Sequence, residues 1–128
     1  MSSENPAITL VREFLDATMA PDPQKAESYI SPDLQITFAG GRQFHHPREI
    51  AAFNGRRYQW VKKELGPFDV CEMPQGTVVY SLGTLYGAWP DGTPFEHNRF
   101  IDRFLIRDGK IVRMDVWNDS AERLLDAQ

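Results

Sequence analysis

The residue best suited to chemistry in this sequence is an aspartate on the apolar side of a predicted strand. Segment 95–107 alternates in polarity, and successive side chains of a strand point to opposite faces of its sheet. Asp102 therefore shares the predicted core face with Phe100 and Phe104. An ionised carboxylate is very costly to bury alone, so Asp102 must be paired, hydrogen-bonded or protonated. Burial would raise its pKa, which suits a general acid; the alternative is a structural Asp bonded to its neighbours.

Two asparagines and a methionine share this predicted face. By the same alternation, Glu96 and Asn98 lie on the side of Asp102, and Val112, Met114, Val116 and Asn118 form the core face of the last strand. Either asparagine could orient a carbonyl or hydroxyl group of a ligand, with Met114 in the apolar wall. The alternative is that both amides lie at strand ends near solvent.

The adjacent histidines His45 and His46 precede a predicted helix. His45 could reach the mouth of a pocket as a base, because the ordinary pKa of histidine lies close to neutral pH. The alternative is an exposed loop pair or a helix cap. The third histidine, His97, is predicted on the opposite sheet face, and the single cysteine, Cys71, reads as a small buried residue of a strand. We therefore expect no metal site, no internal disulfide and no cofactor.

The elements that must position these residues are helices followed by strands. Proline at the first helical position, preceded by Asn5 or Asp22, marks two helix starts, and Asp108-Gly109 is a strong hairpin signal. We expect helices at 6–20, 23–29 and 47–65, strands at 34–38, 68–73, 77–89, 95–107 and 110–117, and a short C-terminal helix after Asp119. Long antiparallel strands with helices on one face predict an α+β roll, a cone-shaped domain over 1–128 with a hollow on the concave side of its sheet.

Aromatic side chains dominate the predicted inward surface. The inward set is Phe14, Phe38, Phe53, Trp60, Tyr86, Phe100 and Phe104. Most of these rings must pack the core, and any cavity that remains between them would favour a flat, apolar, ring-bearing small molecule. The other face carries Leu85, Trp89, Ile101, Leu105 and Trp117. So much apolar surface on the convex side predicts a homodimer formed through the sheet.

Composition excludes several classes of function. The 128 residues carry a formal net charge of −4 and no concentrated basic patch, which disfavours nucleic acid as a partner. No apolar run approaches the roughly 20 residues that a membrane span requires. The N-terminus lacks a secretory signal pattern, so the expected location is cytoplasmic.

The last hairpin resembles a known family. Residues 100–114, Phe-Ile-Asp-Arg-Phe-Leu-Ile-Arg-Asp-Gly-Lys-Ile-Val-Arg-Met, and then Trp117-Asn118-Asp119, are similar to the closing hairpin of the nuclear transport factor 2-like superfamily. The SnoaL-like polyketide cyclase branch is the most similar, and segment 47–53 also fits. The resemblance implies a curved sheet with helices on its concave face, but this fold hosts many unrelated activities.

The resemblance also implies roles that can be compared residue by residue. Ketosteroid isomerases of this superfamily use an aspartate base, and an oxyanion hole of a tyrosine and a protonated aspartate. Asp102 matches the protonated aspartate, but Phe14 stands at the oxyanion tyrosine and Phe38 at the base. Asn54 stands at a supporting tyrosine, and only Tyr29 is kept from the tyrosine network. Because a phenyl ring cannot move a proton, we expect no standard ketosteroid isomerase.

Two classes of function remain open. A related limonene epoxide hydrolase uses an Asp-Arg-Asp set, yet Arg99 and Arg103 are predicted to point away from Asp102. The SnoaL-like cyclases, thought to need one acid/base Asp in an apolar cavity, are the better match. The first hypothesis is thus a cofactor-independent isomerase, cyclase or dehydratase with Asp102 as acid/base. The second is a non-catalytic ligand-binding or dimeric interaction domain.

Overall fold

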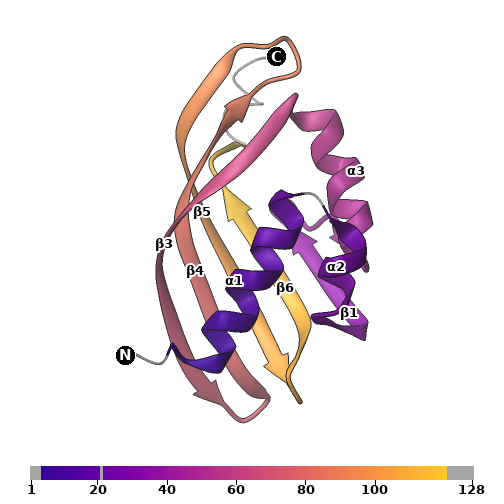
Figure 1. The fold of residues 1–128 in the computed structure, drawn as a ribbon, viewed down its shortest axis with the longest axis vertical. Coiled ribbons are helices and arrows are strands. Elements are labelled where there is room, and N and C mark those ends of the chain that lie inside the picture. Colours follow the sequence, from indigo (N-terminus) through magenta and orange to yellow (C-terminus); the bar gives the residue numbers. More distant parts are fainter. Residues whose placement is uncertain (1–3, 21, 121–128) are drawn as a thin grey trace.

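In the described part of the chain, six strands form one curved sheet with three helices on its concave side (Figure 1). The computed structural model describes residues 4–20 and 22–120. Its elements are α1 (Pro6–Met19), α2 (Pro23–Glu27), β1 (Ile30–Phe38), β2 (Gln43–Phe44), α3 (Pro47–Arg57), β3 (Trp60–Met73), β4 (Gly76–Ala88), β5 (Pro94–Arg107) and β6 (Lys110–Asn118). The strand order is β2-β1-β6-β5-β4-β3, and every pair is antiparallel except β1 with β6. The predicted α+β roll is confirmed; the helix predicted after Asp119 lies outside the described residues.

All three helices begin with the same chemistry, a side-chain cap followed by proline. Asn5 accepts a hydrogen bond from the backbone N–H of Ala7, and Asp22 accepts one from that of Lys25. His46 caps α3 through its Nδ1, which accepts from the Arg48 backbone N–H at 3.1 Å. Each cap satisfies a helical N–H that has no partner in the first turn.

The third helix is shorter than its apolar pattern predicts. It was expected to reach Leu65 but ends at Arg57, and β3 begins at Trp60. Apolar residues at 58, 61 and 65 fit a helical period, but the pairing of β3 with β4 from Trp60↔Ala88 to Leu65↔Gly83 decides the conformation. In the strand, Val61, Lys63 and Leu65 share the inward side. A helix over 47–65 would place Lys63 on a solvated face with Arg56, Arg57 and Lys62, whereas the strand turns Lys63 toward the interior.

Two bulges correct the predicted alternation of β5 and β6. Phe95 and Asn98 pair with Gly87 and Leu85, so one extra residue sits in β5, and His97 adopts the left-handed conformation with φ 64°. An extra residue in one strand reverses which side chains face inward. Glu96 is therefore exposed instead of facing the core, while Phe95 is buried. In β6 a bulge between Ile111 and Arg113 buries Ile111 in place of Val112.

The strand register also corrects which residues of β4 face inward. Because Ser81 pairs with Asp102, the odd residues of β4 lie on the same face as the even residues of β5. Leu85 is consequently buried on the concave side, whereas Tyr86 is exposed on the other side, where it packs edge to face with Trp60. The aromatic pattern predicted that Tyr86 and Trp60 face inward, and this prediction is wrong for both residues. Cys71, predicted to be buried, is also exposed on β3, the edge strand.

A glycine on the concave face helps the sheet to bend. A Cβ atom at Gly83 would collide with the backbone carbonyl of Glu64 and lie 2.8 Å from the ring of Phe100. Any side chain at Gly83 would therefore hold β3 and the Phe100 ring away from β4. The missing side chain allows the close approach that the curvature requires.

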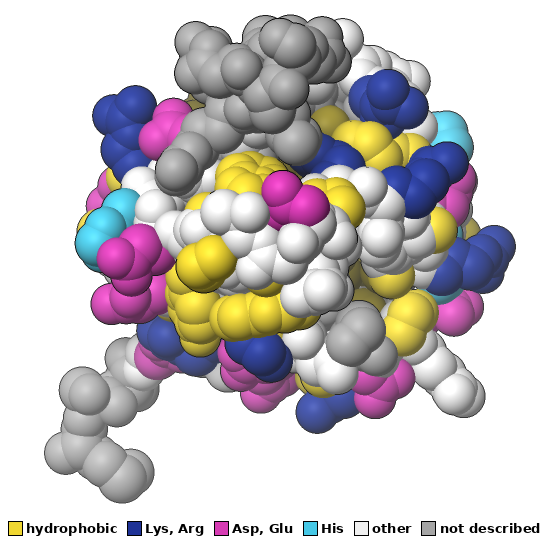
Figure 2. All heavy atoms as spheres, turned by 90° about the horizontal axis from the view of Figure 1, so that it is seen from above, with side chains coloured by type: hydrophobic (Ala, Val, Ile, Leu, Met, Phe, Trp, Pro, Cys, Tyr) yellow, Lys and Arg dark blue, Asp and Glu magenta, His cyan; other side chains and the backbone are white. Residues whose placement is uncertain are grey.

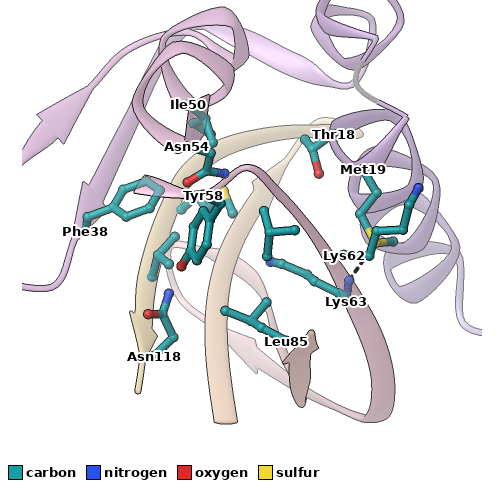
Figure 3. A pocket seen from close by; sticks show the side chains of 13 residues that line it. Thr18, Met19, Phe38, Ile50, Asn54, Tyr58, Lys62, Lys63, Leu85 and Asn118 are labelled. Atoms are coloured by element: carbon teal, nitrogen blue, oxygen red, sulfur yellow. Dashed lines mark hydrogen bonds between the residues drawn. The ribbon is translucent and has the colours of Figure 1, made fainter. Parts of the chain in front are cut away.

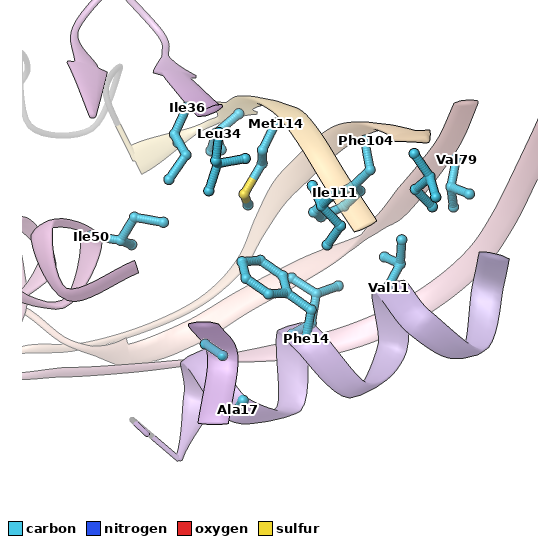
Figure 4. Packing of buried hydrophobic residues seen from close by; sticks show 14 of the residues in the cluster. Val11, Phe14, Ala17, Leu34, Ile36, Ile50, Val79, Phe104, Ile111 and Met114 are labelled. Carbon is cyan, nitrogen blue, oxygen red and sulfur yellow. The ribbon is translucent and has the colours of Figure 1, made fainter. Parts of the chain in front are cut away.

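The main core fills the narrow part of the roll, between α1 and the sheet (Figure 4). Phe14 on α1 and Phe104 on β5 pack edge to face, with ring centroids 6.0 Å apart. A second cluster of Tyr58, Leu85, Phe95 and Phe100 lies toward the other end of β4 and β5. The pocket described below opens between these clusters.

The surface at the β4–β5 end mixes charges of both signs. Seen from above, Lys and Arg side chains are interspersed with Asp and Glu around exposed apolar atoms (Figure 2). Within the described residues, no helix is both long and apolar enough to cross a membrane.

Candidate functional site

A cavity of about 70 Å³ lies between the concave face of the sheet, the end of α1 and α3. Apolar side chains make most of its wall. Its lining consists of Thr18, Met19, Phe38, Ile50, Asn54, Tyr58, Val61, Lys62, Lys63, Leu85, Met114, Val116 and Asn118. Figure 3 shows Phe38 and Lys63 on opposite sides, with the hydroxyl group of Tyr58 pointing toward Asn118.

Three neutral polar side chains offer hydrogen bonds to an occupant of this pocket. Asn54 comes from α3, Asn118 from the end of β6, and Tyr58 from the residue after α3. Tyr58 is buried, and burial raises the pKa of its hydroxyl group, while a hydrogen bond to Ser120 acts in the opposite direction. Tyr58 is thus a neutral hydrogen-bonding group rather than a base at ordinary pH.

Two lysines line this pocket: Lys62 is exposed, and Lys63 forms an ion pair with Asp102. Lys63 Nζ donates a hydrogen bond to Asp102 Oδ2. Asp102 is fully buried, and its Oδ1 has no hydrogen-bond partner within the described residues. Burial raises the pKa of the Asp102 carboxyl group, while the charge and hydrogen bond of Lys63 lower it; burial is the larger effect.

The two partners are placed differently with respect to the pocket. Lys63 lines the cavity and its side chain keeps 17% of its exposure, whereas Asp102 lies behind it, outside the lining. Lys63 Nζ also lies 4.5 Å from the centroid of the Phe100 ring. The Oγ of Ser81, opposite Asp102 in the register, is buried without a hydrogen-bond partner in the described chain. Lys63 is therefore the polar contact between the buried carboxyl group and the pocket.

Comparison with known proteins identifies the family. Residues 11–114 match the model of the SnoaL-like domain. The chain belongs to the SnoaL-like family. No curated protein matches the chain.

Solved structures with the same fold match nearly the whole length of this SnoaL-like chain. A nuclear transport factor 2-like protein of unknown function from Burkholderia pseudomallei has a TM-score of 0.77 at 18% identity, covering 95% of this chain and 97% of its own. TerC, crystallised with polyporic acid, has a TM-score of 0.77 at 18% identity, covering 94% and 97%. A polyketide cyclase-like protein from Xanthomonas campestris has a TM-score of 0.73 at 19% identity, covering 96% and 97%. At these identities the likeness shows the fold.

Four of the residues predicted to bind a ligand line the pocket of this SnoaL-like domain: Phe38, Asn54, Met114 and Asn118. The other seven lie elsewhere. Phe14 and Phe104 fill the main core, and Tyr29 and Phe53 pack against its side. Asn98 is buried and donates a hydrogen bond to Ser120 Oγ at 3.2 Å.

Phe100 and Tyr86 are the remaining two residues that were predicted to bind a ligand. Phe100 lies beneath the Lys63 ammonium group and outside the pocket lining, and Tyr86 is exposed on the far face of the sheet. The SnoaL-like pocket is consequently less aromatic than the sequence predicts, with Phe38 and Tyr58 as its rings.

His45 does not reach the pocket in this conformation. Its ring Nδ1 lies 3.2 Å from the Leu34 carbonyl oxygen, the side chain is exposed, and it is absent from the lining. Its neighbour His46 caps α3, which is the alternative expected of the pair. No group of three or more potential metal ligands occurs in the described part of the chain.

Lys63 and Tyr58 are the functional candidates that sequence reasoning missed. Both were assigned to the apolar or solvated side of a longer helix. The signal that could have found Lys63 is the alternation Val61, Lys63, Leu65 before Gly66-Pro67, which also fits a strand. Lys63 supplies a basic partner for Asp102 from a strand that was not predicted at that position.

Proposed function

We propose that this SnoaL-like protein binds a small, largely apolar, ring-containing molecule and catalyses a cofactor-independent isomerisation, cyclisation or dehydration. Asp102 acts as the acid/base. The observation that carries the proposal is the Lys63–Asp102 pair: a fully buried carboxyl group with an unbonded Oδ1, coupled to a lysine that lines the pocket.

The environment of Asp102 supports this role. A carboxyl group whose pKa is raised by burial can give up or take a proton nearer to neutral pH than an exposed one. Lys63 can relay a proton between the two, giving one N–H proton to the occupant as it takes one from Asp102, because its ammonium group bonds Asp102 and the residue lines the pocket. The apolar wall suits an organic ring. TerC, which shares the fold, was crystallised with polyporic acid, and we extend only the idea of a small organic occupant.

A second candidate is a ligand-binding domain without chemistry. The observation that favours it is the position of Asp102, which bonds Lys63 and does not touch the pocket. In that case the pair is a structural device that holds β3 against β5. The two candidates differ in whether the carboxyl group exchanges protons with an occupant.

Proton transfer to a simple probe separates the two candidates. Nitrobenzisoxazole is a flat apolar molecule that loses a ring proton to a base, breaks its N–O bond and gives a coloured cyanophenolate. We expect the wild type to accelerate this elimination and Asp102→Asn to lower the rate about 100-fold or more, the range for removing a general base. Asp69→Asn, an exposed carboxylate on β3, is the matched control and should react like the wild type.

Binding must be followed in parallel with turnover. Anilinonaphthalene sulfonate fluorescence reports whether Asp102→Asn keeps its apolar pocket. If the variant binds this dye and eliminates nitrobenzisoxazole as fast as the wild type, the acid/base role is excluded and the binding domain stands.

We also propose a symmetric homodimer through the convex face. Ile101 and Trp117 are cross-strand neighbours there and keep 42% and 50% of their exposure, and Leu82 pairs with Ile101 beside them. These three residues line a shallow hollow that a second copy could fill. Light scattering after gel filtration should give a dimer mass for the wild type and a monomer for Trp117→Lys. A monomeric wild type at micromolar concentration contradicts the proposal.

The free, exposed thiol of Cys71 favours a reducing compartment. We therefore propose that the protein acts in the cytoplasm.

A further inference from the structure

Lys63 Nζ has a hydrogen-bonding capacity that the fold does not fill. An ammonium group has three N–H donors. One is used by Asp102 Oδ2, and the face of the Phe100 ring lies 4.5 Å from the nitrogen. Among the described residues, Nζ makes no other hydrogen bond. Because Lys63 also lines the cavity, a remaining donor is available to whatever enters.

We propose that Lys63 is the residue that recognises the occupant, and that the occupant is an apolar ring carrying an anionic or enolisable oxygen: a phenolate, an enolate or a conjugated carbonyl. The inference rests on the proposed function, since it places the substrate in the same pocket. It assigns the contact to Lys63 rather than to Asp102, which is held behind it.

The surroundings of the lysine favour an oxygen acceptor over other groups. The walls beside Lys63 are apolar, formed by Val61, Leu85 and Val116. In such surroundings a charge-assisted N–H···O bond is shorter and stronger than a neutral one, and water competes less for it. A cationic ligand would meet the ammonium charge, and a purely apolar ligand would leave a buried donor unsatisfied.

The pocket also limits where the rest of the ligand lies. Asn118 and Tyr58 line the same cavity as Lys63, and the Tyr58 hydroxyl group points toward Asn118 (Figure 3). A ring that directs its oxygen to Lys63 would therefore have these two neutral polar groups within the same cavity. A second carbonyl or hydroxyl group there would find neutral hydrogen-bond partners in Asn118 and Tyr58.

The charge of Asp102 makes the binding contribution of Lys63 separable from catalysis. While Lys63 bonds Asp102, part of its field is neutralised. Removing the carboxylate leaves the ammonium group and its donors in place. Asp102→Asn should therefore bind an anionic ring more tightly than the wild type, although the proposed proton transfer is lost.

The test compares para-nitrophenol, whose colour reports its ionisation, with nitrobenzene, which has the same ring but no acidic oxygen. In the wild type we expect para-nitrophenol to bind more tightly and its spectrum to shift toward the phenolate at a pH below the pKa of the free phenol. Lys63→Met should weaken para-nitrophenol binding about tenfold or more and abolish the spectral shift, with nitrobenzene binding kept. Lys63→Arg should keep the preference, and Lys25→Met, an exposed lysine on α2, is the surface control.

Each outcome bears on the inference. A Lys63→Met variant that binds para-nitrophenol with wild-type affinity and spectrum overturns it. If Lys63→Met loses nitrobenzene binding as well, the double variant Lys63→Met/Asp102→Leu, which leaves no unpaired charge, is measured next. Restored nitrobenzene binding without a preference for para-nitrophenol supports the inference. Equal loss of binding of both probes overturns it. Failure of the proposed function looks different, because Asp102→Asn would then keep nitrobenzisoxazole turnover whatever para-nitrophenol does.

Discussion

Lys63→Met is expected to lower the free energy of unfolding by about 3–5 kcal/mol at neutral pH, the range for removing one partner of a buried ion pair. The substitution leaves the fully buried Asp102 carboxyl group without its cation. The carboxyl group must then be either ionised in an apolar site or protonated, and both cost free energy at neutral pH. Urea unfolding followed by tryptophan fluorescence measures the change.

Two further variants show that the loss comes from the unpaired carboxyl group. Lys63→Met/Asp102→Leu removes both charges, and replacing a whole buried pair by apolar side chains is often neutral or stabilising, so this variant should recover most of the loss. Lys25→Met should stay within about 0.5 kcal/mol of the wild type, as surface substitutions do. A double variant no more stable than Lys63→Met would show that packing of the lysine stem, rather than charge, sets the cost.

The raised pKa of Asp102 also predicts how stability depends on pH. Above the pKa that this carboxyl group has in the unfolded chain, about 3.9, the unfolded chain has released the proton that the native protein still holds. The unfolding free energy then falls as pH rises, until the pH passes the higher native pKa. The total fall is about 1.4 kcal/mol for each unit by which the pKa is raised.

Lys63, the titratable group that faces Asp102, determines how the pH dependence of stability differs between the variants. Lys63 on β3 is the charged side chain bonded to Asp102, and Ser81 on β4 and Val116 on β6 are the uncharged cross-strand neighbours of Asp102. Asp102→Asn should lack this fall in stability between acidic and neutral pH. Lys63→Met should extend it to higher pH, because the lysine lowers the pKa of Asp102. Parallel pH profiles of Asp102→Asn and the wild type contradict the prediction.

The fold and the position of Asp102 could be predicted from local patterns. The caps at Asn5 and Asp22 and the Asp108-Gly109 hairpin act over a few residues, and the alternation around Asp102 holds because no bulge lies between Phe100 and Phe104. Family resemblance and alternation agree for these elements, and the structure confirms them.

The partner of Asp102 could not be predicted, because it depends on pairing between distant segments. The apolar spacing of Tyr58, Val61 and Leu65 fits a helix, the alternation of Val61, Lys63 and Leu65 fits a strand, and the pairing with β4 selects the strand. The bulges at His97 and beside Ile111 likewise depend on neighbouring strands, so simple alternation misplaces Glu96. The number of aromatic rings in the pocket wall was also overestimated. Phe14 packs against Phe104 in the closed core instead of facing the cavity, and this contact depends on how α1 packs against β5.

The central claim is that Asp102 is a buried acid held behind Lys63, and its carboxyl resonance tests this most directly. Carbon NMR of the side-chain carboxyl groups, assigned with Asp102→Asn and titrated with pH, reports the protonation of this group alone. The account predicts a midpoint above the ordinary range for aspartate in the wild type and a still higher one in Lys63→Met, because burial raises the pKa and the lysine lowers it. A wild-type midpoint at or below about 3.9, the ordinary value, would contradict it.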